Sequence, residues 1–286
     1  MRYGISDIKK KRQIQKNKSN DANTRMYQMS EVEAAMLFLS SNRKVIFEKI
    51  QNVIQRSSYE PVKNGTEKIH DLYYDTRDRR LEAQKIQLRV RILQEKVYKV
   101  TLKVLKEIRE NYSDRVEIER FWSQEAFNII ANNLVRMDIR FQGSERSYDN
   151  DPKITFNNLG LIIIQNRKTI REILNAVNKI SGQIEFEFDI DTTSILLNSN
   201  NEIRFSELEI ESKKSGNEKK LDKIVDQVIK FPEFMSWPHS KLETGMAIRN
   251  LFNNKLLDPK SDYDEKNELK ANGIRKISDL LNYRDP

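Results

Sequence analysis

The sequence has no cysteine and only two histidines. Among its 286 residues the absence of cysteine excludes structural disulfides, thiolate metal ligands and a cysteine nucleophile. His70 and His239 are far apart in the chain, which argues against a histidine-rich zinc site. Any metal ion must therefore depend on carboxylates, which suit hard cations such as Mg²⁺ or Mn²⁺.

Long apolar runs are also missing. No stretch of about 18 apolar residues occurs, so no transmembrane helix and no membrane association are predicted. The first residues are basic and polar and lack the apolar segment of a signal peptide. These absences predict a soluble, cytoplasmic protein. With only 8 glycines and 6 prolines, and with recurring apolar alternation, the chain does not have the composition of a disordered one.

Charge is abundant, and its balance is basic. Charged residues make up 33% of the chain, and the formal net charge is +8. One interpretation is solubility with weak attraction to polyanions, and another is a polyanionic substrate. Net charge does not distinguish these two interpretations, but the positions of the charged residues in the sequence can.

The hydrophobic pattern predicts about eight strands interleaved with three or four helices. Strands are predicted at 31–38, 69–74, 86–93, 97–104, 114–121, 183–191 and 204–213, with one or two more in 159–174, whose second half is also compatible with a helix. Helices are predicted at 43–56, after Ser123 as N-cap, at 217–230 and at 241–253. Residues 138–158 read as a loop with a short strand.

The two ends of the chain differ in composition from its middle. Residues 1–29 are predicted to be a flexible basic arm, either a solvated tail or an anchor on RNA, another polyanion or a partner. Residues 30–252 form the predicted folded domain. Residues 253–286 are predicted to be a charged tail with a short helix near 274–281.

Charged side chains repeat at every second position in six predicted strands, opposite apolar ones. The sets are Glu31 and Glu33; Arg89 and Arg91; Lys99, Thr101 and Lys103; Arg115, Glu117 and Glu119; Glu185, Glu187, Asp189 and Asp191; and Glu207, Glu209 and Glu211. In a half-exposed sheet these faces meet water. In a closed barrel under covering helices they line the interior, where acidic strands would hold a metal ion and basic strands a phosphate chain.

Short motifs follow one another in a fixed order along the chain. They are E-V-E at 31–33, Y-Y-D-T at 73–76, L-R-V-R at 88–91, T-L-K at 101–103, R-V-E-I-E at 115–119, E-L-E-I-E at 207–211 with K-S-G at 214–216, and S-K-L-E-T-G at 240–245. In this order the motifs resemble the CYTH superfamily, or triphosphate tunnel metalloenzymes. That family includes inorganic and thiamine triphosphatases and class IV adenylate cyclases, with fungal-type RNA triphosphatases as relatives. The resemblance covers about residues 30–252.

The resemblance implies an α+β, mainly antiparallel fold, with an eight-stranded closed tunnel barrel under covering helices. By analogy, Mg²⁺ or Mn²⁺ is bound by Glu31, Glu33, Glu207 and Glu209, together with Asp189 or Asp191. Substrate phosphates are bound by Arg89, Arg91, Lys103 and Lys241, with Arg167 or Arg171 as the basic residue of the middle strand. Glu117 and Glu119 line the tunnel, and the implied catalytic set is Glu31, Glu33, Arg89, Arg91, Lys103, Glu119 and Lys241.

These residue types suit phosphoryl transfer, which depends on charge neutralisation and positioning more than on covalent chemistry. The resemblance therefore implies metal-dependent hydrolysis of inorganic triphosphate or of a small organic or nucleoside triphosphate. A class IV-type cyclase and an RNA 5′-triphosphatase are alternatives on the same scaffold. The basic arm favours the RNA 5′-triphosphatase, but the motifs lie closer to the small-molecule branch of the family.

One position departs from the family motif. The lysine that ends the opening E-x-E-x-K motif is replaced by Ala35. Lys99 or a residue of the basic arm is a candidate to replace the missing charge. The same departure motivates a fourth alternative, a binding module for triphosphates without catalysis.

Overall fold

The computed structural model describes residues 29–40, 42–94, 96–108, 113–143, 148–214 and 216–283. Apart from Met29, the predicted basic arm lies outside the described residues. The strands are β1 (Met29–Phe38), β2 (Tyr59–Asp75), β3 (Ile86–Gln94), β4 (Val97–Ile108), β5 (Ser113–Phe121), β6 (Ile162–Asn178), β7 (Ile184–Leu196), β8 (Glu202–Ser212) and β9 (Phe234–Ser236). The helices are α1 (Arg43–Arg56), α2 (Arg80–Ala83), α3 (Gln124–Arg136), α4 (Pro152–Asn158), α5 (Glu218–Val228), α6 (Lys241–Asn253) and α7 (Ala271–Asn282).

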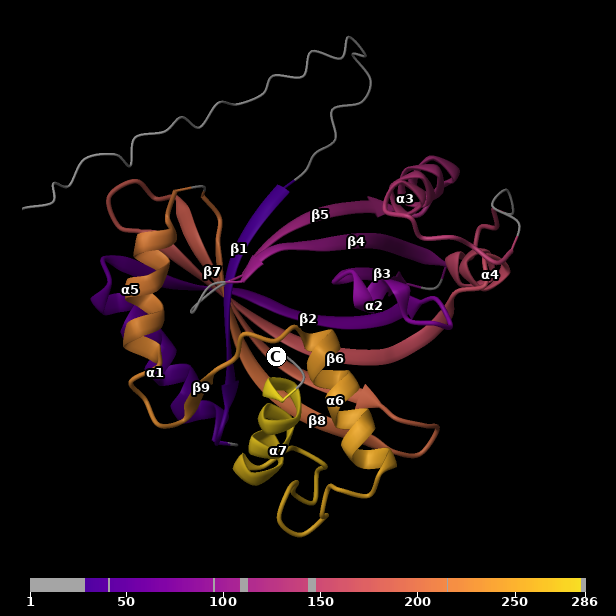
Figure 1. Ribbon diagram of the computed structural model, residues 1–286. Coiled ribbons are helices and arrows are strands. Elements are labelled where there is room, and N and C mark those ends of the chain that lie inside the picture. The colour runs from indigo at the N-terminus through magenta and orange to yellow at the C-terminus, as the bar shows by residue number, and fades with distance from the viewer. Residues whose placement is uncertain are drawn as a thin grey trace, which may run out of the picture.

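The strands form one antiparallel sheet whose two ends meet (Figure 1). The order is β5-β4-β3-β2-β6-β7-β8-β1-β9, and β1 also pairs with β5. Residues 29–33 of β1 pair with β5, and residues 33–37 pair with β8. Each of β1 to β8 therefore has a neighbour on both sides, which confirms the predicted α+β tunnel architecture.

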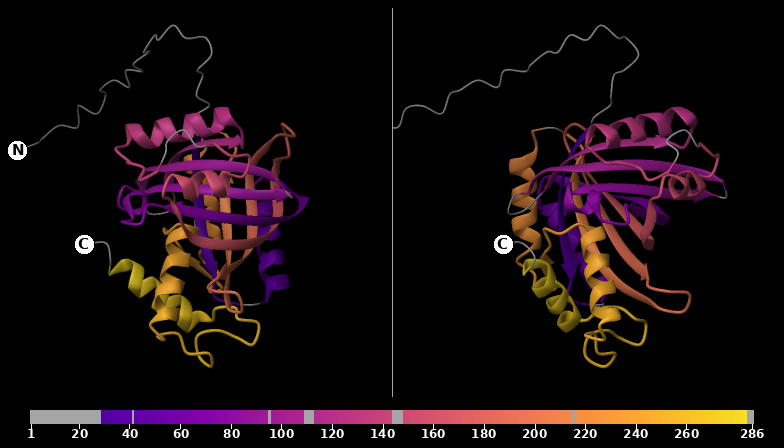
Figure 2. Two further views of the ribbon diagram at one scale, coloured as in Figure 1. Left: turned by 90° about the vertical axis from the view of Figure 1, so that its right-hand side faces the viewer. Right: turned by 45° about the vertical axis from the view of Figure 1, so that its right-hand side comes forward.

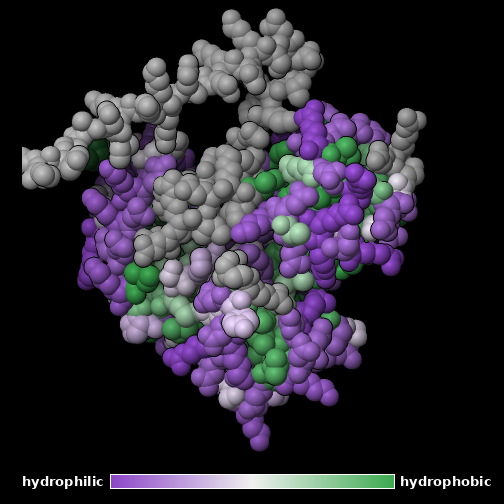
Figure 3. Space-filling model, in the orientation of Figure 1, coloured by the Kyte–Doolittle hydropathy of each residue, from purple (hydrophilic) through white to green (hydrophobic). Residues whose placement is uncertain are grey.

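Helices cover the apolar outer face of this ring on two sides. On one side α1 and α5 pack over β7, β8 and β1, where Phe186, Phe188 and Ile210 are buried. On the other side α3 and α4 pack over β3 to β5, where Leu88 and Leu102 are buried. Since successive side chains on a strand point to opposite faces, charged side chains such as those of Arg89, Lys103 and Glu209 face the interior. On the one face visible in Figure 3, the described surface is mostly hydrophilic, with apolar residues in scattered patches.

The segment after Asn253 packs against the barrel. Both views of Figure 2 place α6 and α7 together at the end of the barrel away from α3. Side chains from the predicted tail, Leu257, Leu269, Ile274, Ile277 and Leu281, are buried in a core with Phe205 and Trp237. The predicted short helix is α7. The backbone before it adds to β8, where the Arg204 N–H donates to the Asn267 carbonyl at 2.7 Å.

Three sequence predictions differ from the structure. β2 begins at Tyr59 rather than near Ile69, because a bulge between Lys63 and Gly65 and an exposed stretch hide its alternation. β6 is a single strand without a helical second half. The predicted loop 138–158 contains α4, whose N-cap Asp151 accepts a hydrogen bond from the Lys153 N–H, with proline at the first turn.

No helix among the described residues is long and apolar enough to cross a membrane.

Candidate active site

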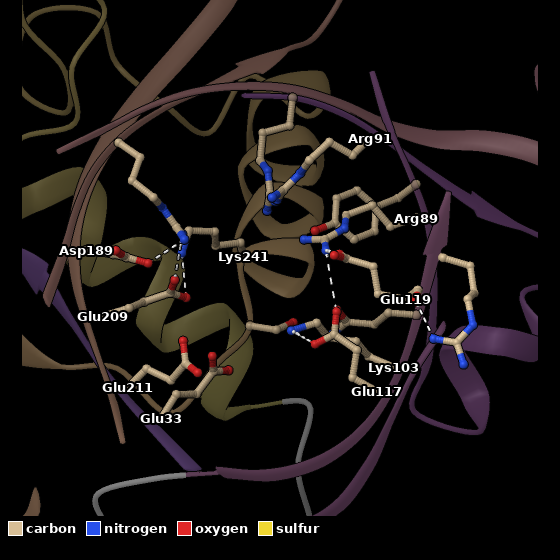
Figure 4. A pocket seen from close by; sticks show the side chains of 16 residues that line it. Glu33, Arg89, Arg91, Lys103, Glu117, Glu119, Asp189, Glu209, Glu211 and Lys241 are labelled. Atoms are coloured by element: carbon tan, nitrogen blue, oxygen red, sulfur yellow. Dashed lines mark hydrogen bonds and ion pairs between the residues drawn. The ribbon is translucent and has the colours of Figure 1, made fainter. Parts of the chain in front are cut away.

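The interior of the ring contains a cavity of about 350 Å³ lined almost entirely by charged side chains. Figure 4 shows carboxylates on one side, from Glu33, Asp189, Glu209 and Glu211, and basic residues on the other, with Lys241 between them. The alternation of the strands produces this lining, because each strand turns its apolar residues toward the helices.

Arg89, Arg91, Arg167 and Lys103 line one side of the cavity, which we call the basic wall. One buried carboxylate organises its arginines. Asp71 on β2 is 0% exposed, and its Oδ1 accepts a hydrogen bond from Arg91 Nε at 2.8 Å. Its Oδ2 accepts one from Arg167 Nη2 at 2.7 Å and lies 3.9 Å from Arg89 Nη1. Burial alone would raise the pKa of Asp71, but the charges of Arg89, Arg167 and Arg91 outweigh it and hold that pKa well below its usual range.

Further along this wall, β4 and β5 contribute a row of ion pairs. Lys103 Nζ lies 2.7 Å from Glu117 Oε2, and Lys99 Nζ lies 2.7 Å from Glu119 Oε1. Arg89 Nη2 is 3.3 Å from Glu119 Oε2. The two glutamates, which the resemblance implied to line the tunnel, thus contact the basic side chains of this wall.

The acidic wall comes from β7 and β8, whose register places Asp191 opposite Glu207 and Asp189 opposite Glu209. Carboxylate oxygens of Asp191, Glu207 and Glu209 lie within 4.8 Å of one another. Asp191 and Glu207 are almost fully buried. Three carboxylates this close in a buried site require compensating positive charge.

Two basic side chains supply part of this charge. Arg171 makes a paired hydrogen bond to Asp191 at 2.9 and 2.8 Å and also reaches Glu209 at 3.1 Å. Lys241 Nζ lies 3.1 Å from Asp191 Oδ2 and 2.5 Å from Glu209 Oε1, and it also contacts Glu207.

These partners do not neutralise the site fully. Burial and then the charge of Glu33 raise the pKa of Glu209, and burial also raises that of Asp189. Burial lowers the pKa of Lys241 although Asp191 opposes it. Asp189 Oδ1 is buried and has no hydrogen-bond partner among the described residues. An all-carboxylate donor set with an unsatisfied oxygen fits a hard divalent cation such as Mg²⁺ or Mn²⁺.

The helix α6 delivers Lys241 into the tunnel. Ser240 is its N-cap and forms a capping box with Glu243, so the first turn is fixed. One turn later the backbone of α6 comes close to β6, since a Cβ on Gly245 would lie 2.3 Å from the Gln165 side-chain oxygen. Gln165 in turn donates to the Lys241 carbonyl at 3.4 Å. The serine and glycine of S-K-L-E-T-G therefore position the lysine.

The structure brings most of the sequence-predicted site residues to this cavity or its walls. Both alternatives of each open pair face the interior, Asp189 with Asp191 and Arg167 with Arg171. The structure describes only the backbone of Glu31, which pairs with the backbone of Arg115. The roles of all these residues in binding and catalysis remain predictions.

The position of the missing motif lysine is also defined. Ala35 is the register partner of Glu209, the glutamate that Lys241 contacts. Lys99, proposed as a replacement, instead pairs with Glu119 on the basic wall. Lys241 and Arg171 are thus the cations that contact Glu209, the carboxylate opposite Ala35.

Sequence reasoning missed Asp71. The signal was present, because Asp71 shares a strand face with Tyr73 in the predicted strand 69–74, but the Y-Y-D-T motif begins only at Tyr73. Tyr73 itself contributes a ring that lies 4.9 Å from the Arg167 guanidinium carbon.

Comparison with known proteins adds the family. Residues 42–235 match the family model of the CYTH domain. No curated protein is significantly similar in sequence. Similar solved structures include HpAC1 from Hippeastrum, described as an adenylyl cyclase candidate with a dominant triphosphatase activity (14% identity, 80% of this chain and 98% of that chain, TM-score 0.48). Others are the PH1819 protein from Pyrococcus horikoshii OT3 (17%, 78% and 99%, TM-score 0.43) and the Pct1 RNA triphosphatase from S. pombe (14%, 74% and 85%, TM-score 0.35).

At these TM-scores the assignment rests on the family match, which spans more than half of the chain and includes strands β2 to β8 of the tunnel. This chain is a member of the CYTH domain family.

Proposed function

We propose that this protein hydrolyses a triphosphate, either inorganic or carrying a small organic group, inside its tunnel with the help of a bound divalent cation. The observation that carries the proposal is the pairing of two walls across one cavity. A cluster of three carboxylates, Asp191, Glu207 and Glu209, faces a set of arginines held by Asp71.

The carboxylate cluster, with Asp189, would hold Mg²⁺ or Mn²⁺. When bound, such a cation supplies neutralisation of phosphate charge and polarisation of the phosphoryl group. Arg89, Arg91 and Lys103 would bind phosphate oxygens, the arginines through two donors each. Because Asp71, Glu117 and Glu119 fix these side chains, little reorganisation is needed when the substrate enters.

Arg171 and Lys241 would change partners on substrate binding. Both now pair with the carboxylates of the acidic wall. A divalent cation would compete for those carboxylates, while the phosphate chain offers new acceptors to the guanidinium and ammonium groups. The two cations would then stabilise the charge that develops on the transferred phosphoryl group.

A second candidate function is triphosphate binding without turnover. Ala35 favours it, since the alanine removes one phosphate-binding cation beside Glu209. A cyclase on the same scaffold would use the same walls and release pyrophosphate.

Product analysis separates these functions. Purified full-length protein is incubated with inorganic triphosphate and with ATP, each with Mg²⁺ or Mn²⁺, beside a Glu207→Gln/Glu209→Gln variant. We expect metal-dependent phosphate release that the double variant loses, together with its Mn²⁺ affinity in calorimetry. Pyrophosphate with a cyclic nucleotide would instead identify a cyclase, and tight binding without any product would identify the binding module.

A further inference from the structure

An exposed aromatic side chain stands at the end of one tunnel wall. Phe121 is the last residue of β5 and is 63% exposed, although phenylalanine is among the residues most often buried. Glu117 and Glu119 line the cavity from the same strand, so Phe121, two residues on, is on the tunnel side. Trp122 confirms this direction, because its ring packs on the opposite side against Phe127 and Phe156.

Phe121 lies in the same cross-strand row as Arg91, one of the predicted phosphate-binding residues. Arg91 pairs with Lys99 in the sheet register, and Lys99 pairs with Phe121. Two strand spacings, about 10 Å, therefore separate Arg91 from Phe121 along this row. Lys99 Nζ lies 5.5 Å from the centre of the Phe121 ring and 2.7 Å from Glu119 Oε1.

The surroundings of Phe121 change from charged to apolar. Val97, on the same face of β4 as Lys99, is exposed, and Leu93 is exposed at the irregularity between Ile92 and Gln94. The lining of the cavity itself is almost wholly charged. A triphosphate alone gains nothing from an apolar rim, whereas a planar ring attached to it would stack there while its phosphates reach Arg91 and Arg89.

We propose that Phe121, with Lys99 as its register partner and the exposed Val97 and Leu93 further along β4 and β3, is a stacking platform for the base of a nucleoside triphosphate whose phosphate chain lies in the tunnel. This inference rests on the proposed function, because it assumes that the tunnel holds the phosphates. The ring of Phe121 supplies a face for stacking, and Lys99 provides a positive charge between the base and the first phosphate. Recognition of this kind is tolerant of base identity, because every base has a π-face.

The test compares two ligands that resist hydrolysis, adenosine 5′-(β,γ-imido)triphosphate and inorganic imidotriphosphate, by calorimetry with Mg²⁺. Phe121→Ala should weaken binding of the nucleotide about five- to tenfold and leave the affinity for imidotriphosphate unchanged. Phe121→Trp should keep the nucleotide affinity, and its fluorescence should respond to the nucleotide but not to imidotriphosphate. Ile163→Ala, an exposed apolar side chain on β6, is the matched control.

Unchanged nucleotide affinity in Phe121→Ala, or an equal loss for both ligands, would overturn the platform. A different result would contradict the proposed function itself. If wild-type protein binds neither ligand, or if Arg89→Ala leaves imidotriphosphate affinity intact, the tunnel does not hold phosphates, whatever Phe121 does.

Discussion

Asp71 is a single residue on which three cations depend. Its carboxylate is fully buried and contacts Arg89, Arg91 and Arg167. A charge buried among partners stabilises them only while all are present, since removal of one partner leaves the others uncompensated. Asp71 is therefore a positioning residue: it holds the arginines of the basic wall in place and is not itself expected to contact substrate phosphates.

Asp71→Asn keeps the shape of the side chain and removes its charge. We expect imidotriphosphate affinity to fall at least about tenfold, because the three guanidinium groups lose their fixed geometry. The free energy of unfolding should fall by about 3 kcal/mol. Calorimetry and urea unfolding measure the two effects.

The matched control is Asp262→Asn, which also removes a buried carboxylate, but one that pairs with Lys276 on α7. That variant should lose stability and keep its ligand affinity. Equal loss of affinity in both variants would show that Asp71 acts only through general stability. Mn²⁺ affinity should stay at the wild-type value in both variants.

At the scale of single residues, the sequence predicted which side chains share a strand face better than it predicted which side chains they contact. Two-residue alternation placed Glu207 with Glu209, and Arg89 with Arg91, on shared strand faces, and the family resemblance implied that these faces are interior. It did not separate Arg167 from Arg171, because both point inward. Only the register does so, by setting Arg171 opposite Asp191 and Arg167 opposite the apolar Ile195.

At the scale of elements, the close packing of α6 against β6 fixes the position of Lys241 along the tunnel axis. Gly245→Ala would place a methyl group 2.3 Å from the Gln165 side-chain oxygen, so either α6 or the amide must move. We expect a loss of about 1–3 kcal/mol in unfolding free energy and weaker imidotriphosphate binding.

A second change tests this reason. Gln165→Ala removes the obstructing amide, so the Gly245→Ala/Gln165→Ala double variant should regain much of the stability that the single Gly245→Ala variant loses. A double-mutant cycle from thermal unfolding measures the coupling. Strict additivity of the two changes would mean that the close approach does not constrain α6.

A different contact ties β7 to α5. The Lys220 ammonium donates to Glu185 Oε2 at 2.8 Å, and the Tyr59 hydroxyl donates to the same oxygen at 3.0 Å. The hydrogen bond from Lys220, with that from Tyr59, lowers the pKa of Glu185 to about 2 against the cost of burial. Because the unfolded value is about 4.3, this contact stabilises the protein above about pH 4.3 and is lost as pH falls toward 2.

Glu185→Gln should therefore lower the free energy of unfolding by about 1–2 kcal/mol at pH 7. The difference between variant and wild type should shrink as the pH falls from about 4.3 toward 2, because about half of the wild-type carboxylate is protonated near pH 2. Urea unfolding at several pH values measures this. A difference that is constant with pH would assign the effect to packing instead of charge.

Elements with strong local signals were predicted well, and those defined by distant partners were not. The bounds of α1 and α6 agree with the sequence prediction, because each has a helical apolar period and α6 also has a serine cap. The first half of β2 lacks such a signal, since most of its side chains are exposed and its pairing with β6 alone defines it.

For the whole molecule, the C-terminal segment is part of the barrel's core. Removal of residues after Asn253 would expose Phe205 and Ile203 on β8 and delete five buried apolar side chains. We expect a loss of stability of about 5 kcal/mol or more, seen as a lower melting temperature and lower soluble yield. An unchanged melting temperature would show that the segment is dispensable.

The sequence indicated eight alternating strands, but only the resemblance implied that they close. Closure depends on the β1–β5 and β1–β8 pairings, which join residues far apart in the chain and leave no local pattern. The packing of α7 was missed for a similar reason, since its partners are on β8 and α6 and its flanks are charged.

The position of β1 between β5 and β8 also sets an order of assembly during synthesis. Leu37 finds its register partner only at Glu207, so the first strand waits while most of the chain is made. Such long-range pairing gives a high contact order and slow folding, in milliseconds to seconds at the scale of individual domains. The carboxylates of β8 and the lysine of α6 arrive last. A nascent chain therefore has the arginines of β3 well before it has a tunnel, and the cluster of Asp191, Glu207 and Glu209 lines a closed interior only once the ring closes.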